Sequence, residues 1–141
     1  MRRAVIIVNI VNACIVGLAM MGSLATRNLA NADLYDDDEM AALLQDYKDQ
    51  PIGAAVAIMG AQILASLCGI TGGIKFHVPL TAISAVAYVV YLVMDLIHFN
   101  VGGIIYHGLF LYPHVFFIQE VRNGIMTESN YPNEKQSCCC V

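Results

Sequence analysis

The chain alternates between long apolar blocks and short polar connectors. Four blocks stand out, at about residues 4–25, 52–70, 79–98 and 101–121. A helix that crosses the hydrocarbon core of a bilayer needs about 20 mainly apolar residues, and each block reaches or approaches that length. The pattern predicts an all-α fold: an integral membrane four-helix bundle over residues 1–121, with short loops and a polar tail at residues 122–141.

Proline and glycine mark the expected helix boundaries. Pro51 and Pro79 stand where the second and third blocks begin, a position at which the missing N–H costs a helix little. Two glycine pairs, Gly72-Gly73 and Gly102-Gly103, follow the second and third blocks. We expect these pairs to break the helices there.

Composition supports lipid as the solvent. Hydrophobic residues make up 58% of the 141 residues and charged residues 13%, against about 25% charged residues in a typical soluble domain. The net charge is -4, and no basic patch suggests a nucleic-acid partner. The bilayer itself is the expected partner, and the sequence leaves open whether further copies or other membrane proteins join it.

The distribution of lysine and arginine predicts the orientation. If the N-terminus is cytosolic, five basic residues fall on the cytosolic side and two outside. Because cytosolic loops carry an excess of Lys and Arg, both termini are expected in the cytosol, at the plasma membrane or an endomembrane. The cytosolic set is Arg2, Arg3, Lys75, Arg122 and Lys135, and the outer set is Arg27 and Lys48.

The first block also has features of a signal peptide. Two arginines, an apolar run and then Ser23-Leu24-Ala25 fit a secretory signal with a small-residue cleavage site. The run is about 22 residues, however, whereas the apolar region of a signal peptide spans roughly 7–15. We therefore expect an uncleaved first helix, with cleavage of residues 1–25 as the alternative.

The connector between the first two blocks is strongly acidic. Seven of the eleven acidic residues lie between Asp33 and Asp49. The apolar residues that follow the acidic run at 36–39 are spaced i, i+3, i+4, i+7. This spacing predicts a short amphipathic helix on the outer face of the membrane. A calcium site is less favoured, because the ligand spacing of an EF-hand loop is absent. The four apolar positions are Met40, Leu43, Leu44 and Tyr47.

The second block carries small residues at every fourth position. Because lipid provides no hydrophobic drive between helices, small residues favour close backbone approach. We expect this stripe to be a helix-packing face, toward another helix of the same chain or toward a second copy. The stripe consists of Gly53, Ala57, Ala61, Ala65 and Gly69.

Three amides also fall inside the apolar blocks, Asn9 and Asn12 in the first and Gln62 in the second. Amides in hydrocarbon usually face other helices and hydrogen-bond across the interface. We expect these residues to hold helices together; a path for a polar substrate is the alternative.

Asp95 is the most informative single residue, since an acid within a membrane helix is costly and suggests a functional site. The turn near Val101 is very short, and Asp95 and His107 lie six residues on either side of it. Antiparallel helices would bring the two to the same depth, with His98 one turn from Asp95. Asp95, His107 and His98 are therefore either a structural polar group or a proton or ion site.

No pattern predicts an enzyme, a cofactor or a metal. There is no nucleophile–base pair, and no His or Cys spacing typical of zinc. Haem ligation by His107 and His114 is disfavoured, because the two lie seven residues apart on one helix.

Three cysteines stand beside the C-terminus, at Cys138, Cys139 and Cys140. Cytosolic cysteines near a membrane are substrates for S-acylation, which we expect for this cluster. Prenylation of Cys138 is less favoured than S-acylation. The two middle positions of its C-a-a-X sequence are not aliphatic, and Val141 is unusual as the last residue. An unmodified or metal-bound cluster is the remaining alternative.

The layout of four spans, short loops, cytosolic ends and a Cys138–Cys140 tail resembles that of the tetraspan membrane organisers, among them the MARVEL-type proteins. The outer loops lack the cysteine pattern of the tetraspanins proper and of the claudins. The resemblance implies a non-enzymatic scaffold or trafficking protein. The rival hypothesis is a small transporter or channel subunit with a proton or ion site at Asp95 and His107.

Overall fold

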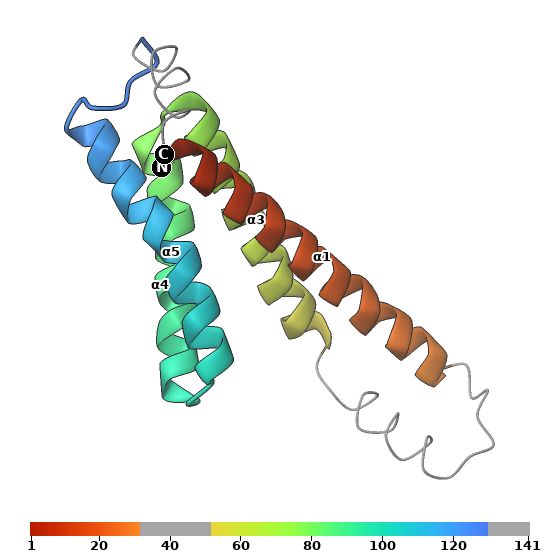
Figure 1. The fold of residues 1–141 in the computed structure, drawn as a ribbon. Coiled ribbons are helices and arrows are strands. Elements are labelled where there is room, and N and C mark those ends of the chain that lie inside the picture. Colours follow the sequence, from red (N-terminus) through yellow and green to blue (C-terminus); the bar gives the residue numbers. More distant parts are fainter. Residues whose placement is uncertain (32–51, 130–141) are drawn as a thin grey trace. The chain divides into compact units, whose positions relative to one another are not determined.

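The computed structural model describes residues 1–31 and 52–129 (Figure 1). The predicted outer amphipathic helix and the cysteine cluster at 138–140 lie outside these residues, as does most of the predicted tail.

The described residues form four helices and confirm the all-α prediction. They are α1 (Arg2–Asn31), α3 (Ile52–Lys75), α4 (Val78–Ile97) and α5 (Val101–Arg122). Each contains a stretch long and apolar enough to cross a membrane, of 27, 23, 20 and 22 residues respectively. The chain is therefore an all-α membrane protein with four candidate spans. Many large apolar side chains on all four helices are exposed, as lipid-facing residues must be.

The prediction that the glycine pairs break the helices is wrong. α3 continues through Gly72 and Gly73 to Lys75, and Gly102 and Gly103 lie in the first turn of α5. The reason is close packing. A Cβ at Gly72 would collide with Thr81 of α4, and one at Gly73 would come within 2.9 Å of the Ile6 side chain of α1.

The helices end instead at residues with left-handed backbone. Phe76 and Phe99 have φ of 52° and 53°, and Gly124 has φ of 69°. In each case the next residue donates its N–H to a carbonyl five positions back; Asn100, for example, donates to Asp95 O at 2.9 Å. This pattern closes a helix C-terminus and usually uses glycine. Two of the three C-termini therefore carry a bulky phenylalanine where glycine is the ordinary choice.

The described chain divides into two compact units. The first comprises Met1–Asn12 and Leu64–Val141, and the second Ala13–Ile63. In the first unit α4 and α5 run side by side as a hairpin (Figure 1). In the second unit Val16 is the one buried residue among those whose side chains are described.

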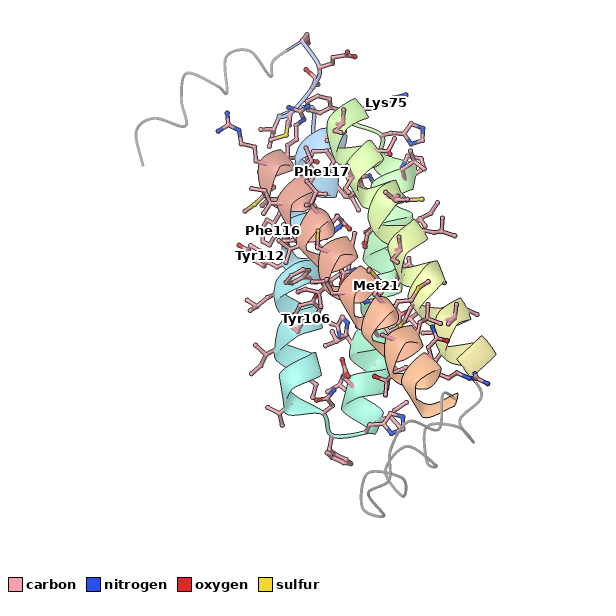
Figure 2. All side chains as sticks on the ribbon, turned by 90° about the vertical axis from the view of Figure 1, so that its right-hand side faces the viewer. Met21, Lys75, Tyr106, Tyr112, Phe116 and Phe117 are labelled. Carbon is pink, nitrogen blue, oxygen red and sulfur yellow. The ribbon has the colours of Figure 1, made fainter. Side chains whose placement is uncertain are left out.

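A small apolar cluster lies in the first unit, at the end where α5 finishes. Val5 and Phe117 are completely buried, and Met126, from the segment after α5, is 6% exposed. Phe76 packs against this cluster, with its ring 6.3 Å from that of Phe117. Figure 2 shows Phe117 and Lys75 toward this same end, whereas Tyr112 and Phe116 point outward from α5.

Candidate functional site

Asn9 of α1 is the centre of a buried polar cluster in the first unit. Its Nδ2 donates to Val5 O at 2.8 Å and lies 2.7 Å from His114 Nε2. Its Oδ1 accepts from the Ser84 hydroxyl at 2.8 Å and from the Tyr88 hydroxyl at 3.3 Å. An amide offers two N–H donors and one oxygen with two acceptor positions, so Asn9 uses its full hydrogen-bonding capacity without water.

The same contacts determine the state of His114, which is completely buried. Its Nδ1 lies 2.7 Å from Phe110 O, and a carbonyl can only accept, so Nδ1 must carry the proton. Its Nε2 faces the Asn9 amide group, which can only donate, because the alternative amide orientation would set Asn9 Oδ1 against Val5 O. His114 is therefore a neutral imidazole with its proton on Nδ1.

Asn12 lies one turn along α1 and adds the remaining helix, α3, together with a second contact to α5. Its Nδ2 donates to Ser66 Oγ of α3 at 2.7 Å, and its Oδ1 accepts from the Tyr106 hydroxyl of α5 at 2.8 Å. We call the seven residues around the two asparagines the central cluster. It takes members from all four helices: Asn9, Asn12, Ser66, Ser84, Tyr88, Tyr106 and His114.

Six of the seven residues of the central cluster are buried, and Tyr106 is half-buried. Asn9 and Asn12 are at most 1% exposed, and none of the described buried side-chain nitrogens and oxygens lacks a partner. Gly69 of α3 lies directly against Asn9, since a Cβ there would collide with the amide. A chain cleaved after Ala25 would lose both asparagines and, with them, the centre of this network.

Asp95 and His107 form a second polar group near the turn between α4 and α5. Asp95 Oδ2 lies 2.5 Å from His107 Nδ1, and the two side chains are 15% and 13% exposed. Asn100 donates its Nδ2 to Asp95 Oδ1 at 2.9 Å, while its Oδ1 caps α5 by accepting from the Gly103 N–H. A side chain at Gly103 would collide with the Asp95 carboxylate, so glycine permits this approach.

Two tyrosines hold the His107 imidazole. Tyr91 of α4 stacks on it with ring centroids 5.4 Å apart, and Tyr106 meets it edge-on at 5.1 Å. His98 is not part of the group. It is exposed at the end of α4, and no hydrogen bond joins its ring to Asp95 or His107 within the part of the chain that the structure describes.

The predicted small-residue stripe is divided between the two units. Gly69 is buried and Ala65 half-buried, both in the first unit. Gly53, Ala57 and Ala61 belong to the second unit and are exposed, and the region around Gly53 is open enough to take a Cβ. The packing role of the stripe as a whole stays a prediction.

The sequence indicated the asparagines but not their partners. Ser84, Tyr88, Ser66 and Tyr106 carry hydroxyls that are common in membrane helices, so no local signal distinguishes them. His114 was considered only as a haem ligand. In the structure the His114 ring bonds to Asn9 and to Phe110 O, and His107 bonds separately to Asp95. Asn100 was the one partner with a local signal, because asparagine is a preferred residue at a helix N-terminus.

Among residues 1–31 and 52–129, no group of three or more His, Cys, Asp and Glu side chains could hold a metal ion. Comparison of the chain with profiles of protein families, with curated proteins and with solved structures gave no match.

Proposed function

We propose that this protein is a non-enzymatic membrane organiser or trafficking protein. The observation that supports this best is the buried central cluster. A carrier or channel needs polar groups that face a wet path, whereas Asn9, Asn12 and His114 are buried and hydrogen-bond to groups of their own and neighbouring helices. Such a network specifies how helices meet, which is what a rigid four-span scaffold requires. The layout similar to the tetraspan organisers agrees with it.

The proposal includes two features outside the observed contacts. S-acylation of Cys138, Cys139 and Cys140 would attach the tail to the membrane. The Lys and Arg asymmetry supports cytosolic termini in a plasma or endomembrane. A glycosylation reporter fused after Val141 tests the orientation: it should stay unmodified, and glycosylation would contradict the proposed topology.

An experiment in cells tests the scaffold role together with the tail. Full-length protein and a variant with all three tail cysteines changed to serine are compared by acyl-exchange labelling, by their distribution among membranes and by the membrane proteins that co-purify with them. We expect the serine variant to lose the acyl label, to redistribute and to lose partners. Unchanged distribution and partners would contradict an organising role for the tail.

A small transporter or channel subunit is the second candidate, supported by the Asp95–His107 pair. Unlike the central cluster, the pair is partly exposed and joins a carboxyl group to an imidazole within a span. Purified protein in liposomes that contain a pH-sensitive dye separates the two candidates. The scaffold proposal predicts proton flux no greater than in empty liposomes. Flux that Asp95→Asn abolishes would overturn it in favour of transport.

A further inference from the structure

Four cationic side chains gather at one end of the first unit. Two contacts join the helix termini there. The Met1 ammonium lies 3.1 Å from Glu120 Oε2 of α5, and Arg2 donates to the α3 carbonyls of Gly73 at 2.9 Å and Ile74 at 3.3 Å. The start of α1 therefore meets the ends of α3 and α5. The basic residues at those termini come to the same end, which we call the basic end: Arg2, Arg3, Lys75 and Arg122.

The cations of the basic end differ in what they already bind. Arg2 is committed to the fold, because it bonds two carbonyls and its guanidinium lies 4.8 Å from the centre of the Phe76 ring. Arg3, Lys75 and Arg122 are exposed, and none forms an ion pair with another residue in the described ranges.

The acids that the structure describes near the basic end offset only part of its charge. Glu120 is paired with the Met1 ammonium, and Glu128 stands in the short segment after α5. Asp95, the other acid described in the first unit, is at the opposite turn. Among the described residues the basic end is therefore net positive, and three of its cations form no ion pair there.

The surroundings of these cations favour a lipid over a soluble anion. Lys75 ends one candidate span and Arg122 ends another, so both stand where headgroups meet hydrocarbon. Two apolar side chains beside them are strongly exposed, Ile74 at 50% and Ile125 at 68%. A partner with an anionic headgroup and acyl chains would cover both kinds of surface.

We propose that the basic end binds the headgroups of anionic phospholipids in the adjacent leaflet, through Arg3, Lys75 and Arg122. Lys75 and Arg122 also lie in the last turns of α3 and α5, where a cation stabilises the helix dipole. A test must therefore separate lipid binding from helix stability.

The experiment uses full-length protein in detergent, so that orientation in a membrane is not a variable. Phosphatidylserine or phosphatidylcholine is titrated in, and bound lipid is counted by native mass spectrometry. We expect a preference for phosphatidylserine. Each basic residue near an anionic surface contributes about fivefold, so Arg3→Gln should weaken that preference about fivefold, and the triple Gln variant of Arg3, Lys75 and Arg122 on the order of a hundredfold.

Arg27→Gln is the matched control, since it removes the same charge from the other end of α1 and should leave lipid binding unchanged. Thermal unfolding in the same detergent shows whether the variants remain folded. A folded triple variant that keeps the full preference for phosphatidylserine would overturn the proposal. So would an equal loss with Arg27→Gln, or displacement of the lipid by millimolar inorganic phosphate, which would indicate a site for soluble anions.

Discussion

The two polar groups of the first unit differ in almost every physical respect. The central cluster joins all four helices, contains only neutral groups and is buried except at Tyr106, which is half-buried. The Asp95–His107 pair joins two neighbouring helices through a short turn, contains ionisable groups and is partly exposed. Buried polarity in this chain therefore has two roles. One group holds distant segments together, while the other closes a local hairpin and retains groups that can exchange protons.

The largest effect is expected from breaking the central cluster at Asn9. Asn9→Leu removes the amide that bonds to the buried His114, Ser84 and Tyr88 side chains and leaves Ser84 and His114 only their 3.2 Å contact with each other. A buried group that loses its hydrogen bond costs about 1–3 kcal/mol. We expect unfolding free energy, measured by denaturant titration in detergent, to fall by about 2–3 kcal/mol.

Ile10→Leu is the control for this variant, because Ile10 is next in the chain and 46% exposed. It should leave stability nearly unchanged. If Asn9→Leu were as stable as Ile10→Leu, the central cluster would not hold the helices together.

Glycine substitutions test the same cluster through its packing. Gly69→Ala places a Cβ against the Asn9 amide, and overpacking costs about 1–3 kcal/mol. Gly60→Ala, on the same helix, meets nothing within 4 Å and should be neutral or stabilise by up to about 1 kcal/mol, because alanine favours a helix. Thermal stability of the two variants in one detergent is the measurement. Equal behaviour of the two would contradict the close contact between α1 and α3.

Substitutions at Asp95 should have a smaller effect, because the pair is partly exposed. Asp95→Leu removes both hydrogen bonds and should cost about 1–2 kcal/mol. In Asp95→Asn the amide oxygen can still accept from His107, but the amide N–H group would face the Nδ2 donor of Asn100. We therefore expect an intermediate loss of unfolding free energy, measured by denaturant titration in detergent. Met94→Leu is the control, since Met94 is 49% exposed. A loss for Asp95→Leu as large as that for Asn9→Leu would remove the distinction between the two groups.

The turns after α3 and α4 differ in what surrounds their phenylalanines. Phe76 and Phe99 have the same left-handed backbone, which costs a non-glycine residue about 1–2 kcal/mol. Phe76 offsets that cost by packing on Phe117 and under Arg2, whereas Phe99 is 87% exposed. Phe99→Gly should therefore stabilise the protein by about 1 kcal/mol, and Phe76→Gly should not. Thermal unfolding of both variants checks this, and stabilisation by Phe76→Gly would contradict the role given to its contacts.

The sequence predicted the parts of this structure that depend on local rules. The lengths of the apolar blocks predicted the four helices. The equal distances of Asp95 and His107 from a short turn predicted that these two residues meet. The glycine pairs were misread, because close helix contact and a helix break both favour glycine and only the partner residue distinguishes them. The pairing of Asn9 with His114, 105 residues apart, depends on which helices are neighbours, and one sequence does not contain that information.

The contact between Asn9 and His114 is the centre of the buried network, and the protonation of His114 reports on it directly. Full-length protein labelled with nitrogen-15 at histidine is studied in lipid bilayers by solid-state NMR near neutral pH, with His114→Phe to assign the signal. We expect a neutral ring in which Nδ1 is protonated and donates to Phe110 O, while Nε2 is unprotonated and accepts from Asn9. A protonated Nε2, in either the other neutral form or the imidazolium, would show that His114 does not accept a hydrogen bond from Asn9.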